Sequence, residues 1–112
     1  MSARLTSRML VGALVRRAHA EGGHAMVLRH GDDGAGAVLL QCVERGRFVA
    51  LIERQLDHLG RYRWARCGPA LDEGSALGDY LDRRRARDPD LWLVELDIAE
   101  PERFAAEMTG ET

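Results

Sequence analysis

The amino-acid sequence predicts a single α+β domain with a mostly antiparallel sheet of about five strands and the element order α-β-β-β-β-α-β-α. The first observation is the run 37–53, whose two arms of Val, Leu, Ile, Phe and Cys meet at Arg45-Gly46 as in a β-hairpin. The second is a similar apolar run at 91–98, and the third is helical apolar spacing near both ends. Residues 1–112 have the length of one domain.

The hairpin is expected in the middle of the sheet. Only Gln41 interrupts the apolar residues of 38–43 and 48–52, so helices or a second subunit should cover both faces. Gly46 permits a positive φ in either a two-residue turn or a three-residue turn with a bulge. These two turns differ by one position in strand register, and the sequence leaves both open.

The first helix is expected to begin at Thr6 or Ser7 and to stop at Gly22-Gly23. Its apolar residues share one broad face: Leu10, Val11, Leu14, Val15 and Ala18. The stretch resembles a secretory signal, but its apolar run is short, and Arg16-Arg17 separates that run from the small residues that imitate a cleavage site. We therefore expect a folded helix and a cytoplasmic protein, with no segment of transmembrane length.

Residues 24–30 are expected to form a strand that the glycine-rich loop 31–36 closes. The hairpin follows, and a break at 55–60 ends it. Bulky and charged residues then alternate at 62–66, which is typical of a half-exposed edge strand.

The C-terminal part is expected to hold two more helices around the strand 91–98. Ser75 can cap the first, which ends before Asp88-Pro89 because the residue before a proline disfavours helical backbone. Glu100-Pro101 opens the second, with proline in its first turn and acids near its positive end. Residues 108–112 are expected to be a frayed tail.

Charge is unevenly distributed, although the net charge is only −2. Residues 1–71 carry eleven Arg against six acids, and residues 72–112 carry five Arg against twelve acids. All sixteen basic residues are Arg. A GC-rich genome explains this usage, so arginine identity alone is weak support for phosphate recognition.

Four blocks of sequence carry a resemblance: Arg4-Leu5 with 11–17, Gly31-Asp32 with 35–39, 88–95, and 100–104. In them the chain is similar to the alphaproteobacterial family known as domain of unknown function 1491. The Asp-Pro-Asp-Leu-Trp sequence in the third block is the most specific. The resemblance implies a small cytoplasmic bacterial protein, and it carries over no activity, catalytic residue or ligand.

Arginines interleaved with aromatic residues form one candidate site, because rings such as Tyr62 and Trp64 stack bases while arginines hold phosphates. The pattern suggests an anionic ligand or nucleic acid. Against it, Asp79 and Asp82 lie four and three residues before arginines of the same helix, where local ion pairs form. The strand arginines can also flank an edge strand or pair with the acidic half. The candidate anion-binding residues are Arg61, Arg63, Arg66, Arg84 and Arg85.

The sequence Asp88-Pro89-Asp90-Leu91-Trp92 has two interpretations. In the structural one, Pro89 fixes a turn, Asp88 or Asp90 satisfies backbone donors, and Trp92 anchors the last strand in the core. In the functional one, the paired carboxylates bind a cation or perform acid-base chemistry. We favour the structural interpretation.

Other kinds of site find little support. Cys42 and Cys67 have neither zinc-site nor CxxC spacing, so we expect reduced thiols. The rings of His24 and His30 would stand roughly 20 Å apart on an extended strand, too far to share a metal. No Gly-x-Ser-x-Gly elbow is present, and the loop 31–36 leads into a strand rather than a helix, so no nucleotide fingerprint applies. No catalytic residue, metal or cofactor is predicted.

The sequence thus favours a non-enzymatic binding or assembly module, with no membrane partner. The hairpin is apolar on both faces while the chain supplies only three modest helices, so we expect a homodimer. The alternative function is a small metal-dependent hydrolase or nuclease that uses Asp88 and Asp90.

Overall fold

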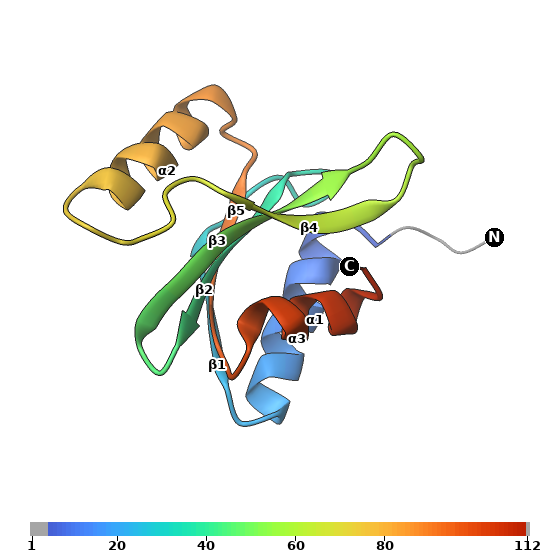
Figure 1. Cartoon of the computed structure of the whole chain (residues 1–112). Coiled ribbons are helices and arrows are strands. Elements are labelled where there is room, and N and C mark those ends of the chain that lie inside the picture. Colours follow the sequence, from blue (N-terminus) through green and yellow to red (C-terminus); the bar gives the residue numbers. More distant parts are fainter. Residues whose placement is uncertain (1–4, 112) are drawn as a thin grey trace.

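One sheet of five strands carries helices on both faces (Figure 1). The computed structural model describes residues 5–111. The strands are β1 (His24–Arg29), β2 (Val38–Glu44), β3 (Arg47–Leu56), β4 (Tyr62–Cys67) and β5 (Trp92–Asp97). The helices are α1 (Ser7–Ala20), α2 (Ala76–Arg87) and α3 (Pro101–Thr109). The fold class and element order predicted from the sequence are confirmed.

The strands lie in the order β1-β5-β2-β3-β4. The last strand in the sequence, β5, is inserted between β1 and β2, antiparallel to the first and parallel to the second. The β2–β3 hairpin is therefore central, as the sequence indicated, while β1 and β4 form the two edges.

The hairpin has the two-residue turn, the first of the two expected turns. Glu44 pairs with Arg47 across a two-residue turn, in which Arg45 and Gly46 have φ values of 52° and 79°. A register shift farther along leaves Val49 as the extra residue of a bulge. The carboxylate of Asp97 accepts hydrogen bonds from the backbone N–H groups of Arg45 and Gly46, at 3.0 and 3.2 Å. The end of β5 thereby fixes the turn.

The two faces of the sheet are covered unequally. Helices α1 and α3 pack on one face and form the larger core with residues such as Leu40, Val94 and Leu96, none of which has exposed surface. Helix α2 covers part of the other face through Leu77, and its smaller core contains Leu39. The expectation that both faces of the hairpin are covered is confirmed for β2. On the face of the sheet where α2 lies, the helix covers only part of the surface.

Helix α1 begins as its sequence predicts. The Thr6 hydroxyl accepts a hydrogen bond from the backbone N–H of Met9, which marks Thr6 as the N-cap. The next residue ties the helix to the β1–β2 loop, because the Ser7 N–H donates to the carbonyl of Gly34. The buried face comprises Ser7, Leu10, Val11, Leu14 and Ala18.

Trp92 joins the β1–β2 loop to the turn that precedes β5. Its indole Nε1 donates to the carbonyl of Asp32 at 2.8 Å, and the Asp32 N–H donates to the carbonyl of Asp90 at 3.0 Å. A Cβ at Gly31 or Gly36 would stand 2.2 Å from that same carbonyl, so only glycine permits this approach. Two of the four sequence blocks singled out above, Gly31-Asp32 with 35–39 and 88–95, thus meet where the loop ends and β5 begins.

Two sequence-based expectations are wrong. Residues 108–111 are not frayed, because α3 continues to Thr109 and Glu111 is held by a bidentate ion pair with Arg54; Thr112 lies outside the described residues. Ser75 occupies the N-cap position of α2, but its hydroxyl donates to the Asp79 carboxylate and caps no backbone N–H.

Replacement of Trp92 by Ala should cost ~3–5 kcal/mol of unfolding free energy, because the side chain is 2% exposed within the larger core. Trp64→Ala should cost less, since that ring is only partly buried beside α3. Urea titration of both variants and the parent measures the difference. Equal midpoints for the Trp92 variant and the parent would refute the structural role of Trp92.

Candidate functional site

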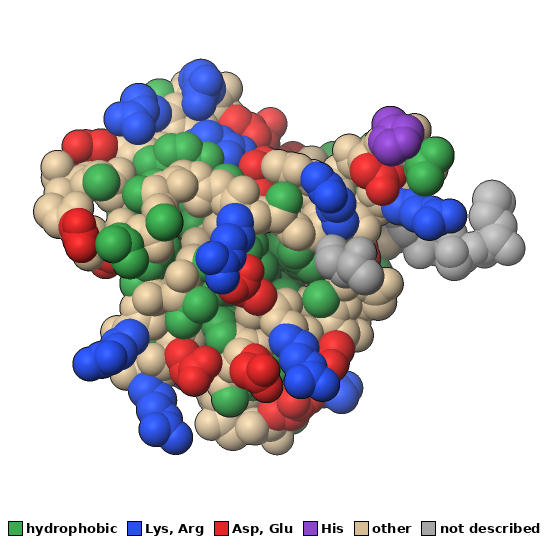
Figure 2. Space-filling model, in the orientation of Figure 1, with side chains coloured by type: hydrophobic (Ala, Val, Ile, Leu, Met, Phe, Trp, Pro, Cys, Tyr) green, Lys and Arg blue, Asp and Glu red, His purple; other side chains and the backbone are tan. Residues whose placement is uncertain are grey.

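The five candidate arginines do not converge on one site. Arg66 reaches Glu102 of α3 on one face of the sheet, and Arg84 reaches Glu53 from α2 on the other. Arg63 is three residues before Arg66 on β4, so it points to the opposite face. Figure 2 shows arginine and acidic side chains interspersed over the face drawn there rather than gathered in a basic patch. The anion-binding hypothesis stays a prediction.

Arg84 is the most constrained of the five. Its Nη1 and Nη2 donate to the two carboxylate oxygens of Glu53 at 3.1 and 2.7 Å, and Nη1 also donates to the Tyr80 hydroxyl at 2.9 Å. The Arg84 and Glu53 side chains are each 17% exposed. The hydrogen bond to Glu53 raises the pKa of Arg84 above its ordinary value. These bonds hold α2 on the sheet.

Other arginines join the basic half of the chain to its acidic half. Arg66 donates to both oxygens of Glu102, and this hydrogen bonding lowers the pKa of Glu102. Arg54 lies 3.9 Å over the Tyr62 ring and pairs with Glu111. One of the two alternatives for the strand arginines, pairing with the acidic half, therefore applies to Arg66.

The expected helix ion pairs from Asp79 to Arg83 and from Asp82 to Arg85 do not form among residues 5–111, where Asp79 binds Ser75 instead.

In the Asp88-Pro89-Asp90 turn, the Asp88 carboxylate binds the backbone. Oδ1 of Asp88 accepts a hydrogen bond from the N–H of Asp90 at 3.2 Å. Within the described part of the chain, no group of three or more His, Cys, Asp or Glu side chains is placed to hold a metal ion. The strand acid Glu44 is also engaged, since it accepts from the N–H of Glu100. The hydrolase alternative therefore lacks a cluster of carboxylates in residues 5–111.

Three of the four histidines, His19, His24 and His30, make local contacts. His30 Nε2 lies 2.8 Å from an oxygen of Asp33, and its ring centroid is 4.1 Å from that of Trp92. His24 stacks on His19 at 5.5 Å. Each therefore has a partner next to it in the fold.

The two cysteines are free thiols on strands that β3 separates. Burial raises the pKa of Cys42 to about 12, with the nearby Glu102 adding to the effect. Burial also raises the pKa of Cys67, while the Tyr80 hydroxyl opposes this shift. Both groups are therefore protonated thiols near neutral pH.

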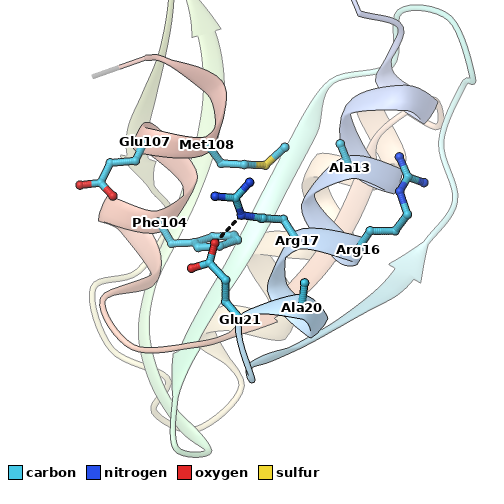
Figure 3. A pocket seen from close by; sticks show the side chains of 8 residues that line it. All are labelled: Ala13, Arg16, Arg17, Ala20, Glu21, Phe104, Glu107 and Met108. Carbon is cyan, nitrogen blue, oxygen red and sulfur yellow. Dashed lines mark hydrogen bonds and ion pairs between the residues drawn. The ribbon is translucent and has the colours of Figure 1, made fainter.

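A groove of about 520 Å³ lies between α1 and α3, over Phe104 and Met108 (Figure 3). Arg17 and Glu21 form an ion pair on its α1 side, while Arg16 points to the other side of α1. Glu107 pairs with Arg103, so no charged side chain that points into the groove lacks a partner within residues 5–111.

Two further hollows flank β1, one on each face of the sheet. The α1–β1 groove, of about 830 Å³, lies beside Met9, Val27 and Trp92. The α2–β5 cavity, of about 150 Å³, lies over Leu91 and Leu93. An apolar hollow is thus available on both sides of this edge strand.

The sequence identified β1 as a strand but did not single it out as a site. Met26, Val27 and Leu28 are 47%, 40% and 39% exposed, an uncommon sequence of consecutive apolar side chains on an edge. A signal was available in the sequence, because no proline, lysine or acid interrupts His24–Arg29. The other edge, β4, presents Arg63 and Arg66 to solvent.

Arg84→Met should lower the unfolding free energy by about 1–3 kcal/mol, because it leaves the Glu53 carboxylate half-buried without its partner. Arg85→Met, one residue away and exposed, should change it by less than about 0.5 kcal/mol. Chemical denaturation measures both. Similar losses for the two variants would contradict a structural role specific to Arg84.

A disulfide reagent such as dithionitrobenzoate, used at pH 8, should modify Cys67 slowly and Cys42 only after unfolding, since the latter is fully buried. A variant with both cysteines changed to Ala should still fold. Mass spectrometry of the modified native protein identifies the reacting thiol. A disulfide between Cys42 and Cys67 in protein from its host would overturn the expectation of reduced thiols.

No helix within residues 5–111 is long and apolar enough to cross a membrane. A comparison with curated proteins gives no match.

The family model "Protein of unknown function (DUF1491)" matches residues 5–106. The crystal structure of a DUF1491 family protein from Caulobacter crescentus has 33% sequence identity to this chain and a TM-score of 0.78, covering 90% of this chain and 94% of that one. The NMR structure of a DUF1491 family protein from Caulobacter crescentus has 33% sequence identity to this chain and a TM-score of 0.77, covering 92% of this chain and 94% of that one. The solution structure of protein Atu0922 from A. tumefaciens has 33% sequence identity to this chain and a TM-score of 0.72, covering 88% of this chain and 89% of that one. The chain therefore belongs to the DUF1491 family.

Proposed function

We propose that the protein is a non-enzymatic binding module that takes up an extended polypeptide segment by strand addition at the free edge of β1. The observation that carries this proposal is the edge itself, where Met26, Val27 and Leu28 are exposed. Alternate residues of an edge strand direct their N–H and C=O groups away from the sheet, and an added strand satisfies them.

The strand β1 lacks most of the features that protect edges against pairing. Protected edges carry charged residues or proline, contain β-bulges, or are covered by another element, and of these β1 has a register shift after Val27 and a terminal arginine. On β4, Trp64 packs beside α3 and Arg66 pairs with Glu102. Arginine occurs only at the last position of β1, Arg29, and the register with β5 shifts between Val27 and Arg29, so the regular part of the free edge, 24–27, is open to a partner.

Hollows on both faces support the same function. In strand-addition complexes the main chain supplies affinity, while pockets for alternate side chains supply specificity. The α1–β1 groove lies on the α1 side of β1, and the α2–β5 cavity lies on its α2 side. Successive side chains of an added strand point to opposite faces, so they reach the two hollows in turn.

A selection from random nine-residue displayed peptides tests this proposal. Selected peptides should protect alternate β1 amides from hydrogen exchange, and binding should be lost when Met26→Lys and Leu28→Lys are combined, because both side chains are exposed and β1–β5 pairing survives. Leu59→Lys is the matched control, since Leu59 is 65% exposed in the β3–β4 loop. Failure to select any peptide, or protection only in the α1–α3 groove, would contradict strand addition at β1.

The homodimer expected from the sequence remains a prediction that the same variants address. Two copies of β1 related by a two-fold axis would pair antiparallel through their free edges. Light scattering that gives the mass of two chains, and of one chain after the double lysine change, would assign the edge to a second copy. If light scattering of the parent gives the mass of one chain, the homodimer prediction is wrong.

A further inference from the structure

The size of the α2–β5 cavity suits a single side chain. Its volume is about 150 Å³, whereas sites for drug-sized molecules run to roughly 300–1,000 Å³. An aliphatic cavity of about this volume accepts a benzene-sized group. Leu81, Leu91 and Leu93 supply the apolar lining. The cavity therefore fits one side chain of the size of leucine or phenylalanine.

The cavity is adjacent to the edge at which we place the added strand. Arg29, the last residue of β1, lines its mouth and pairs in register with Leu93 of its apolar lining. A strand beside β1 therefore passes the mouth. Every second side chain of that strand points to the α2 face, toward the cavity.

The rim carries an excess of positive charge. Arg29 and Arg85 line it together with one acid, Asp82, and neither arginine has an ion pair among residues 5–111. A carboxylate placed at the rim would meet two guanidinium groups. Arginine pairs with carboxylates through two parallel hydrogen bonds, which adds orientation to attraction.

Resting on the strand addition proposed above, we infer that the partner is a segment of another protein that carries a Leu- or Phe-sized residue and an Asp or Glu two positions apart. The apolar side chain fills the α2–β5 cavity, and the carboxylate binds Arg29 and Arg85. The spacing is two because alternate residues of a strand share a face.

A second copy of this chain lacks these features. Two-fold symmetry makes the copies antiparallel, which places the beginning of one β1 beside the end of the other. His24 and Met26 would then approach Arg29 and Arg85, and neither side chain supplies a carboxylate.

Gly78 offers a way to close the cavity without strain. It lines the cavity on α2, and a Cβ at this position meets no atom within 4 Å. Gly78→Met should fill the cavity and strengthen the helix, because glycine is a poor helix former. Loss of binding by this variant cannot be attributed to unfolding when its melting temperature is at or above that of the parent.

The test uses the full chain and the peptides selected from the random nine-residue library. Their sequences should be enriched in an apolar residue and an acid two positions apart. In fluorescence polarisation with one enriched peptide, Gly78→Met should weaken binding at least about tenfold, because the peptide then loses the burial of one leucine-sized side chain. Arg29→Gln and Arg85→Gln should each weaken it by about threefold, as should Glu→Gln in the peptide.

Arg83→Gln and Arg87→Gln are the matched controls on the same helix, since neither lines the cavity, and both should bind like the parent. Peptides that need β1 but show no acid enrichment and no response to Gly78→Met or the rim variants would overturn this inference while strand addition stands. Binding that withstands the double lysine change in β1 would overturn both. A dimer held by β1 would assign the edge to a second copy and overturn this inference.

Discussion

The insertion of β5 between β1 and β2 is the constraint on which the rest of the structure depends. This strand supplies the sheet partner of β1, the parallel neighbour of β2, and Trp92 for the junction with the β1–β2 loop. At its other end Asp97 accepts from both backbone amides of the hairpin turn. Six residues thus hold together elements from both ends of the chain.

Much of the architecture could be predicted because local chemistry specifies it. The Gly22-Gly23 stop, the Arg45-Gly46 turn and Pro101 at the start of α3 are each determined within a few residues. The order of strands in the sheet was not predicted, since it depends on contacts between residues far apart in sequence. The tail was misjudged for the same reason, because the partner of Glu111 is Arg54 on β3.

The candidate sites show the same division between local and distant information. Arginine-rich stretches around Tyr62 and on α2 suggested one surface, but strand alternation and the position of α2 separate Arg66 from Arg84 by the thickness of the sheet. The role of Trp92 was recognised because proline and apolar neighbours indicate a core anchor locally. The sequence of β1 shows only that prolines and acids are absent from it, and its position at an edge follows from the strand order, which depends on residues far apart in sequence.

Ion pairs within the fold explain the unequal charge of the N-terminal and C-terminal halves of the chain. Arg54 and Arg66 of the basic half bind Glu111 and Glu102 of the acidic half, so opposite charges meet where α3 approaches β3 and β4. Exposed pairs of this kind contribute little individually, and the Arg54–Glu111 pair is the better shielded of the two.

The strand order has a consequence for synthesis on the ribosome. The first strand emerges early, yet β5, its neighbour in the sheet that residues 5–111 form, follows roughly sixty residues later. Until then the nascent chain presents β1 with two open edges, while the β2–β3–β4 meander pairs with its sequential neighbours as it appears. Closing this long loop late makes folding slow relative to the local hairpins. During translation, the same apolar strand is therefore the segment that chaperones have most reason to cover.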